Sequence, residues 1–157
     1  MLYILFYMGL RIGELLHLRP AWILKDFTFL RVGDLYEWKL KDEFHPKSQR
    51  ETDKPIAIPN EVRDILKAHS ENVSPYERLF RYTKQGVLYN IKKCAKLAGI
   101  EKNVYSHMLR DSCISYWLNE REKPIQEVSR LARHEDLRTT MIYFHESDEA
   151  HYKTFNQ

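Results

Sequence analysis

With 157 residues, 43% of them hydrophobic and 30% charged, the chain has the composition of one globular domain and is too short for two of ordinary size. Its net charge of +3 suits a nucleic-acid-binding protein but equally an ordinary soluble domain, so charge alone decides little. The two cysteines, Cys94 and Cys113, lack the spacing of a thiolate metal site or a disulfide framework, which argues against both and favours a reducing compartment.

The chain opens with an apolar segment that we predict to be one buried helix over residues 2–18. Arg11 interrupts this segment after ten residues, so it is too short to span a bilayer. Arg11 and Glu14 are three residues apart and share one helix face. Such an arginine either extends to the surface, which periodicity favours, or is held for a ligand. Because the chain begins inside an uncapped helix, we expect it to be a domain of a longer protein.

The hydrophobic period then changes to two, which predicts three short antiparallel strands over residues 27–32, 35–40 and 55–59. The polar connection before the third strand carries Lys47 and Lys54. A charged connection of this kind is as compatible with a solvated hairpin tip as with a functional one.

Two helices are expected in the middle of the chain. Asn60 is a candidate cap for a helix over residues 61–69, and Thr83 for a helix that ends near Ala98. Gly99 then stands where a left-handed residue commonly ends a helix. The exposed face of the second helix is basic, which favours a solvated surface over contact with a DNA backbone; its lysines are Lys84, Lys92, Lys93 and Lys96.

The last third of the chain carries two histidines, an arginine and a tyrosine in close order. Ser106 is a candidate cap for a helix over residues 107–120, which places His107 and Arg110 on one face of its first turn, where an anion is favoured. Pro124 begins a helix ending near Arg133, and a short helix from Thr139 to Phe144 presents a tyrosine; the second histidine and the tyrosine are His134 and Tyr143. Each residue alone is a weak signal, since a single histidine near a helix end is usually structural.

Because these residues occur together and in this order, the chain resembles the catalytic domain of the tyrosine recombinase (phage integrase) family. The matching segments are G-L-R-I-G-E-L at 9–15, P-K-S at 46–48 leading into P-I-A-I-P, S-H-M-L-R at 106–110, and residues 134–143, which end T-T-M-I-Y. The resemblance implies one catalytic domain over residues 1–157 with a mixed α/β fold, mainly helical with a small three-stranded antiparallel sheet. From the same resemblance we expect the family's N-terminal DNA-gripping domain to lie outside these 157 residues.

The resemblance also implies a nucleophile and a phosphate clamp. Tyr143 would attack the scissile DNA phosphate, giving a 3′-phosphotyrosyl link and a free 5′-hydroxyl, while Arg11 and Arg110 would hold the non-bridging oxygens. These residue types suit the chemistry, because an arginine fork binds two phosphate oxygens at once and keeps its charge. A tyrosine with a pKa near 10 needs a neighbour to take its proton.

The remaining roles implied by the resemblance concern protons. His107 and His134 would complete the pocket by hydrogen bonding and proton transfer, and Lys47 would protonate the leaving 5′-oxygen, with Lys54 as the alternative. We expect no cofactor. The covalent link conserves the phosphodiester energy, so ATP is not needed, and the arginines and lysine supply the positive charge that a divalent metal would otherwise provide.

Two departures from the family pattern carry expectations of their own. Arg133 stands where the family usually has glycine, and because arginine adopts a left-handed conformation less readily, we expect a different local backbone or an added phosphate contact. Asp111 stands where the family often has a basic residue, which predicts a locally weaker DNA contact.

The function predicted from the sequence is site-specific DNA recombination or integration by strand cleavage and rejoining. The partners would be double-stranded DNA and further copies of the chain, which would assemble as a tetramer on two DNA sites. The protein would act in the cytoplasm, either of its own cell or, if a virus or plasmid encodes it, of the host cell. Two alternatives remain open, namely relaxation of DNA by type IB topoisomerase chemistry and a degenerate, non-catalytic DNA-binding protein. A zinc protease is disfavoured, because the pattern begun by His134 and Glu135 has Arg138 in place of its second histidine.

Overall fold

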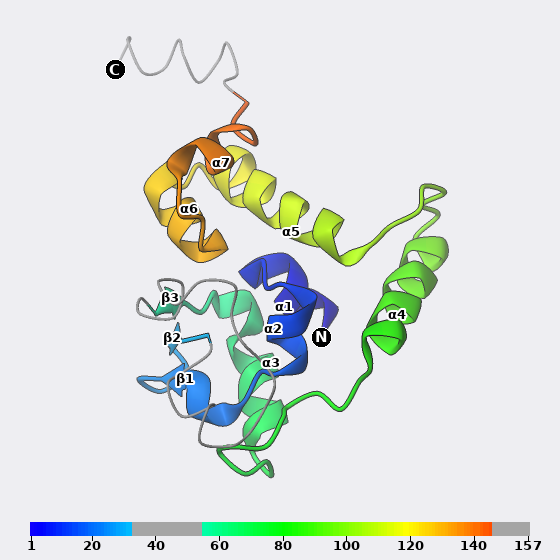
Figure 1. Ribbon diagram of the computed structural model, residues 1–157, viewed down its shortest axis with the longest axis vertical. Helices are drawn as coiled ribbons and strands as arrows, with labels where there is room; N and C mark the ends of the chain where they lie inside the picture. Colours follow the sequence, from blue (N-terminus) through cyan, green and yellow to red (C-terminus); the bar gives the residue numbers. More distant parts are fainter. Residues whose placement is uncertain (33–54, 146–157) are drawn as a thin grey trace.

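The computed structural model describes residues 1–32 and 55–145, which form a mainly helical fold with one small sheet (Figure 1). In chain order the elements are α1 (Leu2–Met8), α2 (Ile12–Leu16), a 3-10 turn (Pro20–Trp22), β1 (Ile23–Leu24), β2 (Phe29–Leu30), β3 (Ile56–Ala57), α3 (Asn60–Ser70), α4 (Lys84–Leu97), α5 (Ser106–Ser115), a π-helical continuation (Tyr116–Glu120), α6 (Ile125–Ala132) and α7 (Leu137–Met141). The predicted fold class is confirmed. In the part of the chain that is described, no helix is both long enough and apolar enough to cross a membrane.

The first helix is broken, so the prediction of one helix over residues 2–18 was wrong. Gly9 ends α1 in the left-handed conformation, with φ of 57°, and Arg11 precedes α2 with an extended backbone. A glycine reaches this conformation without the steric cost of a Cβ atom, which explains where the helix stops. The break leaves the Gly9 carbonyl free to bind a side chain from elsewhere in the fold.

The sheet has three short antiparallel strands in the order β1-β2-β3. Three antiparallel strands were predicted, but the observed strands are not all the predicted ones. The predicted strands over 27–32 and 55–59 contain β2 and β3, whereas β1 was missed and residues 35–40 lie outside the described part. Lys25, Asp26 and Phe27 all have positive φ in the turn between β1 and β2. The turn has no glycine to mark it, which is why the sequence did not reveal the first strand.

Helix ends in the middle of the chain follow their expected caps with small differences. Thr83 accepts a hydrogen bond from the Gly86 N–H at 3.1 Å, and Gly99 has φ of 71°, as predicted. Asn60 and Ser106, in contrast, are the first residues of α3 and α5 and not their caps. In both cases the residue before them already has an extended backbone, so each helix begins one residue earlier than expected.

Two hydrophobic clusters meet at α1. One is formed by α1, α2, the sheet, α3 and α4, and the other by the end of α5, its π-helical continuation and α6. The indole N–H of Trp117, in the second cluster, donates to the Tyr7 carbonyl of α1 at 2.9 Å. Figure 1 shows α5 crossing between α4 and the pair α6 and α7, with α1 beneath it. The first and last thirds of the sequence are therefore joined along α1 and α5.

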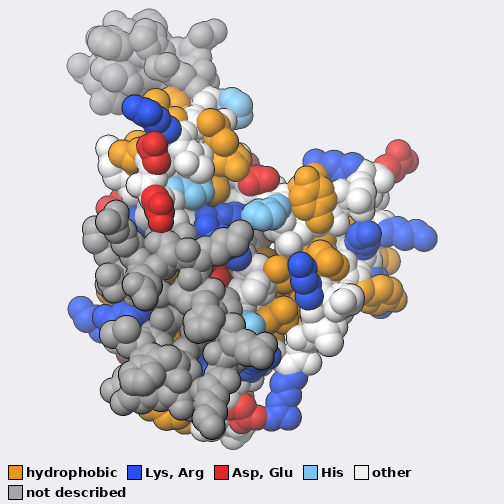
Figure 2. Space-filling view, viewed as in Figure 1, with side chains coloured by type: hydrophobic (Ala, Val, Ile, Leu, Met, Phe, Trp, Pro, Cys, Tyr) orange, Lys and Arg blue, Asp and Glu red, His pale blue; other side chains and the backbone are white. Residues whose placement is uncertain are grey.

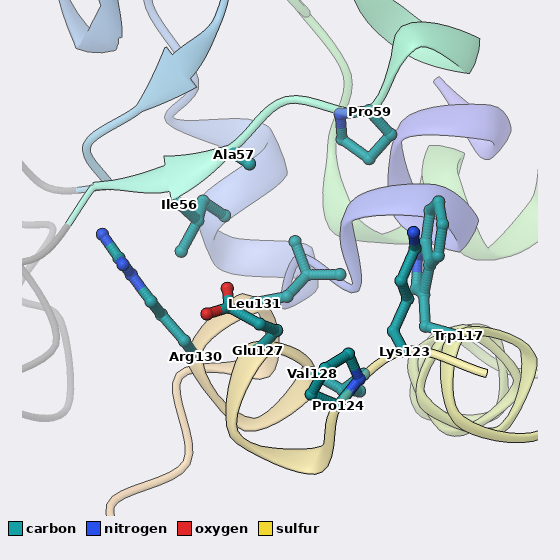
Figure 3. Close-up of a pocket in the computed structure, with 10 residues that line it drawn as sticks. All are labelled: Ile56, Ala57, Pro59, Trp117, Lys123, Pro124, Glu127, Val128, Arg130 and Leu131. Atoms are coloured by element: carbon teal, nitrogen blue, oxygen red, sulfur yellow. The ribbon is translucent and has the colours of Figure 1, made fainter. Parts of the chain in front are cut away.

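A largely apolar groove of about 450 Å³ lies between β3 and α6 (Figure 3). Its walls include Ile56 and Ala57 on one side and Val128 and Leu131 on the other. At its edge the Arg130 guanidinium donates to the Pro55 carbonyl at 2.9 Å. This bond attaches α6 to the chain where it re-enters the described part, just before β3.

Candidate active site

Arg110 joins the ends of two helices. Its side chain is buried, with the residue 5% exposed, and Nη1 donates to the Gly9 carbonyl at 2.6 Å while Nη2 donates to the Ala132 carbonyl. Carbonyls at a helix C-terminus lack partners within the helix and carry partial negative charge, so they suit a cation. Burial and the neighbouring Arg133 and Arg11 lower the pKa of Arg110 to about 10. The guanidinium therefore stays charged at neutral pH while it fixes α1, α5 and α6 around one point.

Glu14 links the first arginine to the turn after α6. Its buried carboxylate accepts from the Arg11 N–H at 2.6 Å and from the Arg11 guanidinium at 3.3 Å. On its other side it accepts from Arg133 Nη2 at 2.6 Å. The charge of Glu14 is thus shared by two arginines that are 122 residues apart in the sequence, which places Arg11 next to the turn that precedes His134.

Both expectations for Arg133 were wrong. The residue adopts the left-handed conformation, with φ of 57° and ψ of 47°, and the His134 N–H closes the turn on the Ser129 carbonyl at 3.0 Å. The glycine-like turn therefore forms with arginine in it. The side chain points inward, where Nη1 donates to the Leu131 carbonyl at 2.9 Å and Nη2 to Glu14, so it is not exposed for a phosphate contact.

His134 follows this turn and is half-buried. Its Nδ1 lies 2.8 Å from the Thr140 hydroxyl oxygen on α7. Burial lowers the pKa of His134 to about 4, and the charges of Arg110, Arg11 and Arg133 act in the same direction. The ring is therefore neutral at pH 7, and a threonine hydroxyl that donates to Nδ1 leaves the Nε2 N–H as a donor for a ligand.

Tyr143 lies just beyond the end of α7, because this helix begins and ends earlier than the predicted one from Thr139 to Phe144. Asn119 fixes the backbone here: its amide donates to the Tyr143 carbonyl at 2.9 Å and its oxygen accepts from the His145 N–H at 3.0 Å. The phenolic hydroxyl donates to Asp111 Oδ1 at 2.7 Å. Burial and this carboxylate raise the pKa of Tyr143 to about 12, with Arg110 acting in the opposite direction.

Four of the six predicted site residues thus come together. Arg11, His134 and Tyr143 each lie near enough to Arg110 for an electrostatic interaction with it. His107 is exposed in the first turn of α5, one helical turn before Arg110, and Lys47, like its alternative Lys54, lies outside the described residues. Figure 2 shows histidine and basic side chains near the middle of one face.

The sequence did not reveal three of the residues that hold this site. Thr140 lies within the matched segment T-T-M-I-Y but was given no role, and Asn119 is an ordinary polar residue in no quoted motif. Asp111 was noted only as an unusual neighbour of Arg110, although it contacts the tyrosine directly. Within residues 1–32 and 55–145, no group of three histidine, cysteine or acidic side chains is placed to hold a metal ion.

Comparison with known proteins points to one family. A model described as "Phage integrase family" matches residues 1–150. A tyrosine recombinase from Thermosipho africanus is 30% identical over 151 residues, which are 93% of this chain and 48% of that protein. The tyrosine recombinase XerD of Listeria innocua is 28% identical over 92% of this chain and 48% of its own length. The chain spans about half the length of these curated relatives.

Solved structures show the same fold. The crystal structure of XerA recombinase matches with a TM-score of 0.67 at 22% identity, over 99% of this chain and 54% of that one. The XerH site-specific recombinase bound to its difH substrate matches with a TM-score of 0.65 at 19% identity, over 99% of this chain and 45% of that one. The arrangement of helices and sheet described above is therefore that of these proteins.

Proposed function

The chain belongs to the phage integrase family, and on that premise we propose that it cleaves and rejoins DNA strands at specific sites through a covalent 3′-phosphotyrosyl intermediate. The observation that supports this best is the placement of Arg11, His134 and Tyr143 around Arg110, each close enough for an electrostatic interaction with it. These residues come from four separate parts of the fold, and their side chains together provide a nucleophile, two cations and a neutral hydrogen-bond donor.

The chemistry is an in-line displacement at phosphorus. The Tyr143 oxygen forms a bond to phosphorus as the bond to the 5′-oxygen breaks, and negative charge grows on the non-bridging oxygens. Donors that are already in place stabilise this charge without reorganising. Arg110 has five N–H groups, of which two are used by the Gly9 and Ala132 carbonyls, so it retains donors for phosphate while those carbonyls hold it still.

The other polar residues take supporting roles in the proposed reaction. Arg11, oriented by Glu14, holds a second non-bridging oxygen, and neutral His134 donates to the phosphate through Nε2. His107 is proposed to hydrogen-bond the DNA at the exposed edge of the site, and Lys47 to protonate the leaving 5′-oxygen. Protonation matters because an alkoxide is a poor leaving group at neutral pH.

We further propose double-stranded DNA as the substrate and four copies of the chain on two sites as the active assembly, acting in the cytoplasm. The XerH structures that resemble this chain were solved bound to DNA, before and after cleavage, which supports the choice of substrate. The relatives reported above are named recombinases, which favours exchange between two duplexes over relaxation of one.

The test is a search for the covalent intermediate. A library of labelled duplexes, each with a nick beside a randomised sequence, traps the intermediate because the cleaved end diffuses away. We expect an adduct of protein and DNA that survives denaturing electrophoresis, is lost in Tyr143→Phe and persists in Tyr152→Phe. Binding without an adduct on any member of the library would instead support the non-catalytic alternative. Sequencing the trapped DNA would also give a substrate for kinetic work.

A further inference from the structure

Asp111 is the residue that contacts the nucleophile. It follows Arg110 on α5, and its Oδ1 accepts the Tyr143 hydroxyl at 2.7 Å across 32 residues of sequence. In the described part of the chain the carboxylate forms no salt bridge, and the Tyr143 hydroxyl is the group that the structure shows bound to it. The family resemblance gave this position no catalytic role, and the unfavourable charge was its only expected effect.

Building on the function proposed above, we propose that Asp111 is the general base that takes the phenolic proton of Tyr143 as its oxygen attacks the DNA phosphate. A general base must lie within about 2.6–3.2 Å of the group whose proton it removes, and this contact meets that requirement. An aspartate performs the same task in protein kinases, where it accepts the proton of the hydroxyl that attacks a phosphate.

The proton and the electron pairs balance in both directions. In cleavage, the Tyr143 Oη–P bond forms, the P–O5′ bond breaks, the phenolic proton moves to Asp111, and a separate acid protonates the leaving 5′-oxygen. In rejoining, the 5′-hydroxyl gives its proton to that group and attacks, and Tyr143 leaves and takes its proton back from Asp111. No metal, oxidant or nucleotide is consumed, and the protein ends as it began.

The same contact keeps the tyrosine inactive without DNA. Burial and the Asp111 carboxylate raise the pKa of Tyr143 to about 12, so the proton rests on the phenol at neutral pH when no phosphate is present. As the Oη–P bond forms, the phenolic oxygen gives up electron density and its proton becomes far more acidic, which makes transfer to the carboxylate favourable. Arg110 and His134 face the same space, and neither has a contact with the hydroxyl of comparable length in the described residues.

The test compares Asp111→Asn with Asp111→Ala on the trapped DNA sequence. Asparagine keeps an oxygen that accepts the Tyr143 hydroxyl but cannot take a proton, so single-turnover cleavage should fall by roughly 10²–10⁴-fold. Asp64→Asn, an exposed change on α3, is the matched control and should cleave at the wild-type rate. Duplex binding and thermal unfolding show that each variant is folded. If Asp111→Asn does not fold, Asp111→Glu replaces it and should cleave slowly because its carboxylate is displaced.

A second substrate separates the base from the acid. In a duplex with sulfur in place of the bridging 5′-oxygen, the leaving group departs as a thiolate and needs no proton, because thiols ionise near pH 8.5. The cleavage rate of Lys47→Ala should return toward the wild-type rate on this duplex, whereas the cleavage rate of Asp111→Asn should stay low. Three outcomes would overturn the proposal: wild-type or faster cleavage by Asp111→Asn, loss only in Asp111→Ala, or recovery of Asp111→Asn on the sulfur duplex. Absence of any Tyr143-dependent adduct from the wild-type chain would contradict the proposed function instead.

Discussion

Two turns with almost the same backbone hold Arg110 from opposite sides. The turn after α1 is made by Gly9, with φ of 57°, and the turn after α6 by Arg133, also with φ of 57°. Each turn supplies one carbonyl to the Arg110 guanidinium, from Gly9 itself in the first and from Ala132 in the second. The same left-handed turn therefore positions a carbonyl for Arg110 in two places. Glycine, which adopts this conformation readily, forms one turn, and arginine, which does not, forms the other.

The surroundings of the two turns explain the difference. A Cβ atom at position 9 would lie 3.1 Å from Cys113 Sγ, so a side chain in that turn would press on the sulfur. At position 133 the side chain has room and a partner, because Glu14 accepts from it at 2.6 Å. A left-handed conformation costs a non-glycine residue about 1–3 kcal/mol. The side chain is held in place despite that strain, because breaking its buried pair with Glu14 would leave an unpaired charge. The backbone shape and the carbonyl appear in both turns, whereas the residue type depends on local space.

The comparison is tested most severely by removing the partner of Arg133. Glu14→Ala leaves a buried guanidinium without its carboxylate, which should lower the free energy of unfolding by about 3–5 kcal/mol, as measured by urea denaturation. Glu77→Ala is the control, because Glu77 also pairs with an arginine, Arg81, but at the surface, where such pairs contribute about 0–1 kcal/mol. Equal losses from the two changes would show that the α6 turn does not depend on its ion pair.

The next largest effect should come from the residue that the two turns share. Lysine in Arg110→Lys has a single charged nitrogen and cannot reach both carbonyls and a phosphate, so cleavage should slow by roughly 10²–10³-fold. The rate of adduct formation on the nicked duplex measures it, with the exposed Arg81→Lys as the control. Near wild-type cleavage by Arg110→Lys would mean that the two carbonyls position nothing of importance.

The α1 turn can be tested by adding one methyl group. Gly9→Ala should destabilise the chain by about 1–3 kcal/mol, because it combines a left-handed alanine with pressure on Cys113. Gly99→Ala isolates the first contribution: Gly99 has φ of 71°, but nothing lies within 4 Å of its added Cβ atom, so about 1 kcal/mol is expected. Thermal unfolding of both variants measures the difference. If the two alanines cost the same, packing at Cys113 does not explain why this turn uses glycine.

The α6 turn should respond in opposite directions in two backgrounds. In the wild-type chain, Arg133→Gly relieves backbone strain but removes the Glu14 ion pair, for a net loss of about 1 kcal/mol. In the Glu14→Ala chain the same change removes an unpaired buried charge as well as the strain, so it should stabilise. A double-mutant cycle on urea midpoints gives the coupling, expected at about 1–3 kcal/mol. Additive effects would rule out the pairing as the reason for arginine.

These turns also show where sequence reasoning succeeds and fails. Periodicity predicted most of the helices and two of the three strands, whereas Arg11, Arg110, His134 and Tyr143 were selected by the family resemblance. The break at Gly9 was missed because the apolar pattern continues across it, and Arg133 was misjudged because its compensation comes from Glu14, 119 residues away. The contact of Asp111 with Tyr143, 32 residues away, was missed for the same reason. Side-chain partners distant in sequence leave no periodic signal, so only the folded geometry reveals them.

The smallest expected effect is a loss of stability at low pH, which should come from the residue after the second turn and not from the residue after the first. Leu10 after the first turn cannot titrate, whereas His134 after the second has a pKa of about 4, below the 6.5 of an unfolded histidine. Between pH 6.5 and 4 the folded chain binds fewer protons at this ring than the unfolded chain does. The free energy of unfolding should therefore decrease as the pH is lowered through that window. Because the ring is only half-buried, the loss should be about 1 kcal/mol.

Urea denaturation of the wild-type chain and of His134→Gln at pH 7 and pH 4.5 measures this loss, and the glutamine chain should lose correspondingly less. Identical pH dependence in the two chains would show that burial and the nearby arginines do not keep His134 neutral.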